Sequence, residues 1–155
     1  MIEYSLEPLL ATIRNEFKAD WNGLHGIRHW DRVFHHGTVI AKKRKADLDV
    51  VTLFAFLHDS CRWNDNSDYR HGERGAEFAY GMNGKLFYLD DSKLDDLCFA
   101  IRHHSGGEIS TNPTIQTCWD ADRLDLGRVG MKPSSKYLSH VAAKMIEAAY
   151  KLSRK

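Results

Sequence analysis

The stretch LDVVTLFAFLHD, residues 48–59, decides the fold of this 155-residue chain. Positions 50–57 are apolar almost without interruption, but they are far fewer than the roughly 20 residues that a helix needs to cross a bilayer. A helix that is apolar on nearly all sides is typically buried in the centre of a domain. We therefore predict a central helix over about residues 48–61, with His58 and Asp59 toward its end.

Apolar residues on both sides of this segment also recur at helical spacing and not in strict alternation. Further helices are predicted over about residues 6–17, 27–45, 71–80, 90–104 and 113–126, and one last core helix after Pro133. Small residues in the 71–80 segment, including Gly72 and Gly75, would allow another helix to approach closely. The pattern predicts an all-α fold, a single domain over residues 1–155 built as a bundle of about six to seven helices.

The charges of the chain nearly cancel, with 22 Lys and Arg against 21 Asp and Glu and a formal net charge of +1. This balance favours neither nucleic acid nor a membrane surface as a partner. The basic run at residues 42–45 is interpreted as a solvated helix end. Cys61, Cys98 and Cys118 form no CxxC pair, which predicts reduced thiols. The first residues do not resemble a secretory signal, so a cytoplasmic location is expected.

Ionisable residues occupy positions where the helical pattern predicts burial. His58, His104 and Asp122 each continue an apolar stripe of a different helix. A buried carboxylate needs a partner and a buried imidazole needs satisfied nitrogens, so one shared cation would offset all three costs. His29, near the start of its helix, would meet His58 and Asp59 in an antiparallel helix pair. The sequence predicts a four-ligand set of His29, His58, Asp59 and Asp122, with a hydrogen-bonded structural role as the alternative for each residue.

Mixed imidazole and carboxylate ligands suit a divalent transition metal, namely Mn, Fe, Co, Ni or Zn, and do not suit Ca, which prefers oxygen ligands. Composition does not choose among these metals, and Mg is kept as a further candidate. Asp122 is preferred over its neighbours Asp120 and Asp125 because the apolar stripe points to it. Asp120 lies on a different helix face, and we expect it to be at most a hydrogen-bond partner of a ligand.

Five segments resemble, in order, the HD-domain metal-dependent phosphohydrolase superfamily. They are HGIRHWDRV (25–33), FLHDSCRWND (56–65), RHGERGAEFA (70–79), IRHHSGGE (101–108) and DADRLD (120–125). A His-Asp dipeptide by itself is not specific. His58-Asp59 at the end of an apolar helix is specific to this superfamily when it is combined with the upstream histidine and the downstream aspartate. The resemblance implies an HD-domain-like helical bundle in which His29, His58, Asp59 and Asp122 hold a first metal.

In binuclear branches of the superfamily a second metal is bound as well, so the resemblance implies one or two divalent ions per chain. His71 and the pair His103 and His104 fall where binuclear branches of the superfamily supply further ligands. His25 occupies the place of a ligand that precedes the first histidine in the HD-GYP cyclic-dinucleotide phosphodiesterases, and Asp59 would bridge the two ions. No GYP element follows, so the sequence does not support cyclic di-GMP as the substrate.

The activity that the resemblance implies is hydrolysis of a small phosphoester, a nucleotide or a related phosphomonoester or phosphodiester, by metal-activated hydroxide. Asp59, Arg62 and Asp65 are the catalytic candidates, and Asp65 would act as an acid or base if its loop folds back. Forked guanidinium groups suit phosphate oxygens. The candidates for binding the substrate phosphate are Arg62, Arg70, Arg74, Arg102 and Arg123.

Other side chains are expected to have lesser roles. Trp63, Tyr69 and Tyr88 lie in or beside loops, where they either stack on a nucleobase or pack against the protein. His35 and His36 follow His29 by one to two turns and are expected to be exposed or locally hydrogen-bonded.

Two alternatives to a hydrolase stay open at this stage. A few HD-like proteins have a similar histidine pattern yet hold two irons and activate dioxygen, and the ligands alone do not distinguish them. The other alternative is a metal-stabilised nucleotide-binding module without turnover. The expected partner is a small phosphorylated substrate such as a nucleotide, and a homo-oligomer is compatible with the sequence.

Overall fold

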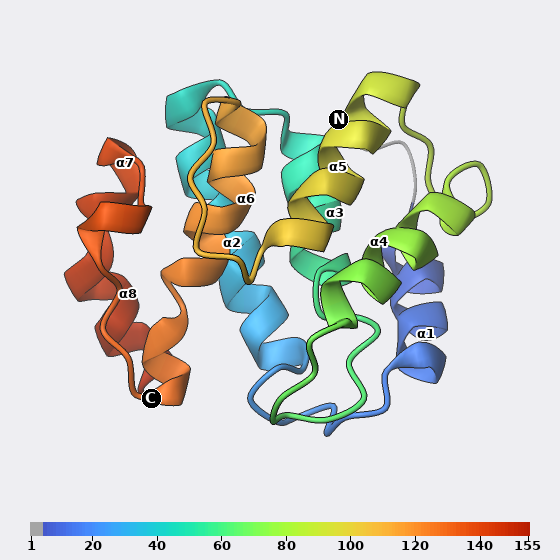
Figure 1. Cartoon of the computed structure of the whole chain (residues 1–155), viewed down its shortest axis with the longest axis horizontal. Coiled ribbons are helices and arrows are strands. Elements are labelled where there is room, and N and C mark those ends of the chain that lie inside the picture. The colour runs from blue at the N-terminus through green and yellow to red at the C-terminus, as the bar shows by residue number, and fades with distance from the viewer. Residues whose placement is uncertain (1–4) are drawn as a thin grey trace.

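The computed structural model describes residues 5–155, and its regular structure there is helical, with no strand in that range (Figure 1). The prediction of an all-α fold is confirmed. The α-helices are α1 (Leu6–Glu16), α2 (Ile27–Arg44), α3 (Leu48–Leu57), α4 (His71–Met82), α5 (Asp91–His103), α6 (Pro113–Arg123), α7 (His140–Ala143) and α8 (Ile146–Ser153). Two 3₁₀ helices, η1 (Leu126–Val129) and η2 (Ser135–Tyr137), lie between α6 and α7.

Helix α3 is the centre of the bundle, as its apolar sequence predicts. Residues 50–57 are all buried, and α3 contacts α2, α4, α5 and α6. Asp47 begins the helix by accepting a hydrogen bond from the Val50 amide at 3.0 Å. The helix ends at Leu57 and not at Cys61, because a turn follows in which the Ser60 amide donates to the Leu57 carbonyl. This turn leaves His58 and Asp59 inside the bundle.

Two glycines bring α4 close to α5 and to the end of α3. A Cβ atom on Gly72 would lie 2.9 Å from the carbonyl oxygens of Ile101 and Arg102. A Cβ atom on Gly75 would lie 3.2 Å from the Leu57 carbonyl oxygen. The close approach predicted for this segment is therefore confirmed, and it places the first residue of α4, His71, against the turn after α3.

The carboxyl-terminal region differs from the prediction of one long last helix, which is wrong. The chain forms η2, α7 and α8 there instead. Ser139 interrupts the helix: its hydroxyl accepts from the Ala142 amide, and it also donates to the buried Asp120 carboxylate. The apolar residues of the predicted stripe still pack inward, where Ala142 and Ala149 form a second buried cluster with Ile40 and others.

Two predictions about the whole chain can be compared with the described residues. All three cysteines are free, as expected for reduced thiols. None of the described helices combines the length and the apolar character needed to cross a bilayer.

Candidate metal centre

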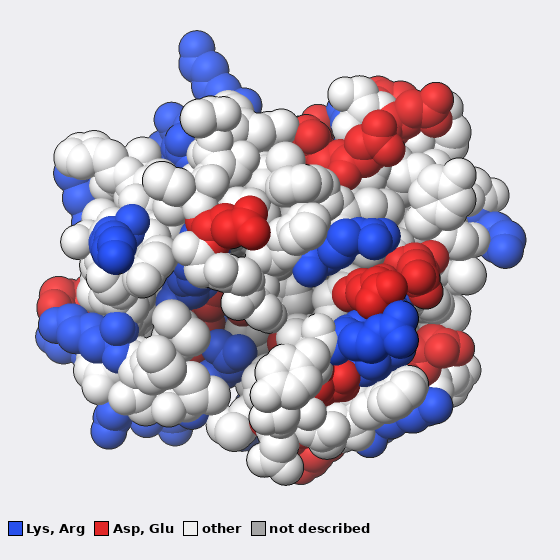
Figure 2. All heavy atoms as spheres, viewed as in Figure 1, with Lys and Arg blue, Asp and Glu red and all other residues white. Residues whose placement is uncertain are grey.

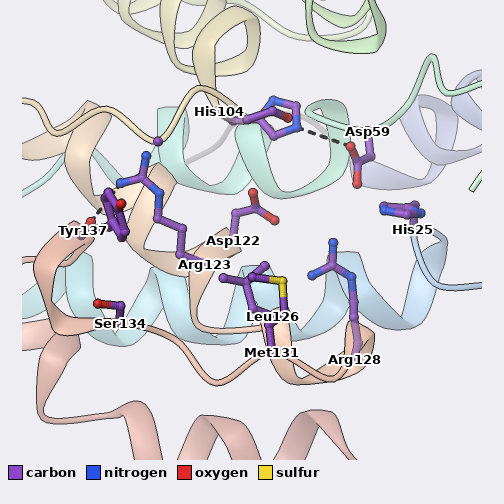
Figure 3. A pocket seen from close by; sticks show the side chains of 12 residues that line it. His25, Asp59, His104, Asp122, Arg123, Leu126, Arg128, Met131, Ser134 and Tyr137 are labelled. Atoms are coloured by element: carbon purple, nitrogen blue, oxygen red, sulfur yellow. Dashed lines mark hydrogen bonds and ion pairs between the residues drawn. The ribbon is translucent and has the colours of Figure 1, made fainter. Parts of the chain in front are cut away.

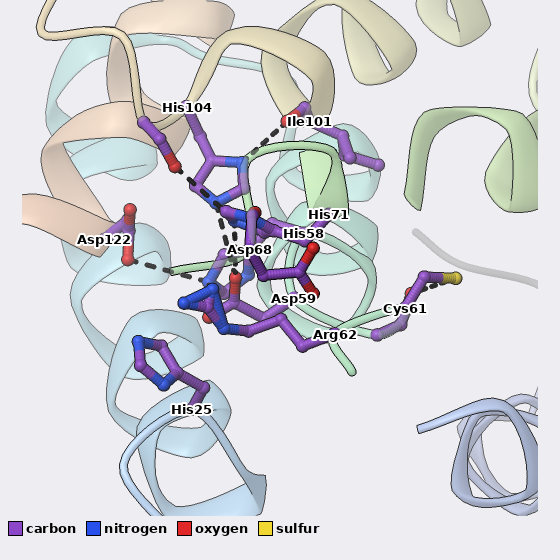
Figure 4. A network of polar contacts seen from close by, with 12 residues as sticks. His25, His58, Asp59, Cys61, Arg62, Asp68, His71, Ile101, His104 and Asp122 are labelled. Carbon is purple, nitrogen blue, oxygen red and sulfur yellow. Dashed lines mark hydrogen bonds and ion pairs between the residues drawn. The ribbon is translucent and has the colours of Figure 1, made fainter. Parts of the chain in front are cut away.

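The imidazole rings of His29, His58, His71 and His104, each at one end of a helix, meet inside the bundle, and the last three are labelled in Figure 4. His29 lies in the first turn of α2, His58 directly follows α3, His71 begins α4 and His104 directly follows α5. The Nε2 atoms of His29 and His58 are 3.0 Å apart, and those of His71 and His104 are 2.9 Å apart. All four side chains are buried.

The Asp59 carboxylate lies between these two histidine pairs and turns one oxygen toward each. Its Oδ2 is 3.6 Å from His29 Nε2 and 3.4 Å from His58 Nε2. Its Oδ1 is 3.2 Å from His71 Nε2 and 3.4 Å from His104 Nε2. One carboxylate thus faces both pairs at the same time.

Asp122, from α6, joins the pair formed by His29 and His58. Its Oδ1 lies 3.2 Å from His29 Nε2 and 3.6 Å from His58 Nε2. We call His29, His58, Asp59 and Asp122 the first ligand group. Asp59, His71 and His104 are the second ligand group, in which the three ligand atoms lie within 4.8 Å of one another.

The outer nitrogen of every ring in these groups faces a hydrogen-bond acceptor. The Nδ1 contacts are 2.6 Å from His29 to Asp125 Oδ2, 3.1 Å from His58 to the Phe54 and Ala55 carbonyls, 2.5 Å from His71 to the Asp68 carbonyl and 2.6 Å from His104 to the Ile101 carbonyl. Because carbonyl and carboxylate oxygens accept, each Nδ1 carries a proton, and each Nε2 is the nitrogen that would bind a metal.

Facing Nε2 lone pairs repel unless a proton or a cation lies between them. Metal bonds of about 2.1 Å place neighbouring ligand atoms about 3 Å apart. The contacts among ligand atoms described above run from 2.9 to 3.6 Å, close to that spacing. The donor atoms and their spacing therefore fit one divalent transition metal between His29, His58 and Asp59 and another between Asp59, His71 and His104, with Asp122 next to His29 and His58.

The pKa values of the first ligand group in the metal-free protein also indicate a cation site. Burial by itself would lower the pKa of His58, but the Asp59 and Asp122 carboxylates outweigh it and raise that pKa to about 10. Burial opposes ionisation of the two carboxylates as well, yet the neighbouring histidines hold both pKa values well below their usual range. In the absence of metal, His58 is therefore protonated, and its positive charge lies between the ionised carboxylates of Asp59 and Asp122.

Asp125 supports the first ligand group from behind His29. Besides accepting from His29, it accepts from Arg32 Nε at 2.6 Å and from Arg32 Nη2 at 3.0 Å. The expectation that Asp120 would have this role is wrong, because Asp120 is bonded to Gln116 and Ser139 instead. Helix α6 ends at Arg123, so the helical spacing does not predict that the Asp125 side chain points toward His29.

A cavity of about 380 Å³ opens beside the two ligand groups (Figure 3). Figure 2 shows a hollow on one face of the molecule with acidic and basic side chains inside it. The cavity is lined by His25, Asp59, His104, Ser105, Gly107, Asp122, Arg123, Leu126, Arg128, Met131, Ser134 and Tyr137. A ligand in this cavity would contact Asp59, which both ligand groups share, and Asp122, which belongs to the first ligand group.

His25 and Asp65, predicted as a ligand and a catalytic residue, contact each other. His25 Nδ1 lies 2.9 Å from Asp65 Oδ1, so the Asp65 loop does fold back, but it reaches His25. The His25 ring lines the cavity, and its centroid is 6.5 Å from that of His29. The structure therefore places His25 beside the ligand groups and not within either of them.

His103, Arg102 and Arg74 are among the predicted site residues that lie outside both the ligand groups and the cavity lining. His103 packs its ring on Phe99, with centroids 4.5 Å apart. Arg102 is exposed on α5. Arg74 donates to both Asp68 carboxylate oxygens at 2.6 Å and lies over the Trp63 ring. These contacts give local structural reasons for His103 and Arg74, and the structure brings none of the three to the cavity.

Two of the predicted arginines are buried close to the cluster. Arg62 is 6% exposed, and its guanidinium extends toward Asp59 and His25 (Figure 4). Its Nη2 donates to the Asn66 carbonyl, while Nε and Nη1 have no hydrogen-bond partner among the described residues. Arg123 lines the cavity, but carbonyl oxygens of the surrounding loops already accept from both of its terminal nitrogens.

The sequence did not reveal Arg128, whose guanidinium reaches into the cavity (Figure 3). It follows the last motif segment and lies on η1, where no helical period predicts its direction. The cavity aromatic is Tyr137, while Trp63 and Tyr69 are largely exposed and absent from the lining. His36 is buried, and neither of its ring nitrogens has a hydrogen-bond partner within residues 5–155, so the expectation that it is exposed or locally hydrogen-bonded is wrong.

Comparisons with known proteins agree with this arrangement. A family model described as the HD domain matches residues 26–135. No match is found among curated proteins. The chain is similar to the crystal structure of a predicted HD superfamily hydrolase from an uncultured Thermotogales bacterium, at 30% identity and a TM-score of 0.73, over 96% of this chain and 87% of that chain. Because the family model covers more than half of the chain, the protein belongs to the HD domain family.

Proposed function

We propose that the protein is a metal-dependent phosphohydrolase that cleaves a small phosphoester. The observation that carries this proposal is the position of Asp59, which turns one carboxylate oxygen to each of two histidine pairs beside an open cavity. A carboxylate shared between two metals is suited to in-line displacement at phosphorus. The description of the Thermotogales protein as a predicted hydrolase supports the same class of reaction.

The two ligand groups would each hold one divalent ion, from the series Mn, Fe, Co, Ni and Zn, with Mg as a further candidate. Bound ions of this kind activate water at neutral pH and neutralise charge on phosphoryl oxygens. The protein orients the ligands from behind: Asp125 accepts from His29, and main-chain carbonyls accept from the other three rings. Rings held in this way keep their lone pairs directed inward.

The chain also supplies groups that would bind the substrate. Arg62 lies beside Asp59, but its Nε and Nη1 are buried and it does not line the cavity, so Arg128, whose guanidinium reaches into the cavity, is the group placed to donate to phosphate oxygens. Across the cavity, Leu126, Met131 and Tyr137 provide an apolar wall on which a flat group would pack. A cavity of about 380 Å³ is near the lower end for ligand sites, so it suits a small molecule. We propose a nucleotide or a related small phosphoester as the partner, and no nucleic acid or membrane.

The first test is metal analysis of protein purified without chelator or added metal, followed by assays of phosphate release. The substrates are a generic phosphomonoester, a generic phosphodiester and a set of nucleotides, with Mn, Co, Ni, Zn, Mg or Fe supplied. We expect two ions per chain and hydrolysis of at least one substrate. The controls are protein without added metal and metal without protein.

Two other outcomes would overturn the proposal. Iron-dependent oxygen consumption with loss of a C–H-bearing substrate and no phosphate release would identify an oxygenase. Tight nucleotide binding without turnover, with every metal tried, would identify a binding module.

A further inference from the structure

The cavity has two ends of different chemical character. Figure 3 shows His25, Asp59 and Arg128 together at one end, next to the ligand groups. Arg123 and Tyr137 lie together at the opposite end and also line the cavity. A phosphoester that places its phosphate against Asp59 would therefore extend its organic part toward Arg123 and Tyr137.

Arg123 offers a flat surface to the cavity and not its terminal donors. Its Nη1 donates to the Tyr137 carbonyl at 2.8 Å, and its Nη2 donates to the Glu108 carbonyl at 2.5 Å. One face of the guanidinium lies over the Trp119 ring, 5.4 Å from the ring centroid. Because Arg123 still lines the cavity, the surface that remains for a ligand is the opposite face of the guanidinium. Guanidinium planes stack on other planar groups.

The Tyr137 ring is a second flat group at this end of the cavity. It lies on η2 and is 39% exposed, while its main-chain carbonyl is held by Arg123 and by Gln116 Nε2. Met131 also lines the cavity and is largely exposed, and a methionine thioether packs favourably against aromatic rings. Covering these apolar surfaces with a ligand would release water and stabilise the bound state.

This end of the cavity is unsuited to a charged group. Among the described residues that line the cavity, the carboxylates are those of Asp59 and Asp122, and both face the histidines of the ligand groups. Both terminal nitrogens of Arg123 already donate to carbonyl oxygens. An ionised group beside Tyr137 would therefore lose hydration without gaining a charged partner from the lining at this end. An uncharged planar ring would not have this cost.

We propose that Tyr137 determines substrate specificity by stacking with an uncharged planar ring that the substrate carries beyond its attacked phosphoester. The open guanidinium face of Arg123 provides a second planar contact at the same end. This inference rests on the proposed function and narrows the substrate from small phosphoesters in general to those with an aromatic or heteroaromatic ring. Phosphoesters of purely aliphatic alcohols should bind more weakly.

A binding experiment tests this role without relying on turnover. Phenylphosphonate and cyclohexylphosphonate, which differ in the planarity of the ring and contain no ester bond, are titrated calorimetrically into the protein with Mn²⁺ in constant excess. We expect phenylphosphonate to bind about fivefold more tightly, because stacked aromatic pairs gain free energy beyond the area that they bury.

Variants of Tyr137 assign that preference to its ring. Tyr137→Leu should remove most of the preference for phenylphosphonate, while Tyr137→Phe should retain it, because the ring and not the hydroxyl makes the stacking contact. The matched control is Tyr88→Leu, which removes an exposed tyrosine that does not line the cavity. Equal affinities for the two phosphonates in wild type, or an unchanged preference in Tyr137→Leu, would overturn the proposal.

A kinetic experiment tests the same contact during the reaction. Benzyl phosphate and cyclohexylmethyl phosphate are compared as substrates, because both release a primary alcohol and they differ in the planarity of the ring. We expect Tyr137→Leu to raise KM for benzyl phosphate about fivefold with little change in kcat, and to leave KM for the other substrate almost unchanged. Equal rises for both substrates would show that Tyr137 supports the cavity without selecting the ring.

The outcomes for the two proposals stay separate. A protein that hydrolyses no phosphoester with any metal would contradict the proposed function, while the phosphonate titrations would still decide on Tyr137. Failure of both phosphonates to bind would overturn the role of Tyr137 as well. The thermal unfolding midpoint of each variant is compared with that of wild type, and it should change little because the Tyr137 side chain is exposed.

Discussion

The two ligand groups share Asp59 and differ in what surrounds it. The first group contains a second carboxylate, Asp122, and its His29 donates to a third, Asp125. In the second group, the outer nitrogens of His71 and His104 donate to main-chain carbonyls. The first group therefore concentrates more negative charge around the position of a cation.

This difference predicts that the two ligand groups bind metal with different affinities. A divalent ion gains more from two carboxylates and a carboxylate-supported imidazole than from one shared carboxylate and two carbonyl-supported imidazoles. The first pair, His29 and His58, is also fully buried, whereas His71 and His104 are 8% and 5% exposed. We expect the first group to bind its metal tightly and the second to exchange its metal more readily.

The largest expected effect comes from removing the shared carboxylate. Asp59→Ala should lose metal from both groups and reduce hydrolysis by about a thousandfold or more, because several kcal/mol of metal-dependent stabilisation would disappear. Elemental analysis and phosphate release measure the two losses, with the exposed Asp95→Ala on α5 as the control. Wild-type activity in a metal-loaded Asp59→Ala protein would refute the assignment of both groups.

The next variant separates the two groups. His71→Ala should abolish metal binding at the second group and leave about one ion per chain at the first, because no ligand of the first group is changed. His103→Ala is the matched control, since its ring packs on Phe99. Equal loss of both ions in His71→Ala, or loss of an ion in His103→Ala, would contradict the comparison.

The support behind His29 can be removed without changing any ligand. Asp125→Asn should weaken metal binding at the first group by about 10- to 100-fold, because an amide is a poorer acceptor for the imidazole N–H than a carboxylate. Asp120→Asn is the control, because it changes a buried aspartate that contacts Gln116 and Ser139. Competition with a metal-sensitive dye gives both affinities, and equal effects of the two variants would show that only stability had changed.

A smaller effect should appear in the pH dependence of metal binding. His58 has a raised pKa of about 10, so below that pH the metal must displace its proton from the first group. The affinity of this group should therefore increase by up to about tenfold per pH unit as the pH rises toward that value. Burial lowers the pKa of His104, so its protonation should oppose metal binding only under more acidic conditions.

Calorimetry in buffers of different ionisation enthalpy counts the released protons. His71→Ala protein, which retains the first group, reports on that group alone. An affinity that does not change with pH would show that His58 is not protonated in the metal-free protein.

Regular helical spacing was enough to predict much of the fold and part of the candidate site. The apolar run of residues 50–57 predicted the buried central helix, and His29, His58, Asp59 and Asp122 do lie together. Each of these side chains lies on or directly after a helix that extends to the cluster, so the helical period gives its direction. Their role as metal ligands stays a prediction that the experiments above test.

Contacts made by turns and loops could not be obtained in this way. Asp125 was passed over because α6 ends two residues earlier, and Arg128 because η1 does not continue the helical period. The pairing of His25 with Asp65 joins positions 40 residues apart through two irregular segments.

The all-α class, the buried central helix and the HD-type pattern of ionisable residues follow from the amino-acid sequence, because they depend on local periodicity and residue chemistry. The residues that surround this pattern are set by the packing of the helices and the paths of the loops. The approach of α4 through Gly72 and Gly75 brings His71 to His104, and the turn after α3 lets Asp59 face both pairs. Such contacts depend on how helices pack and how loops return, and no local pattern contains that information.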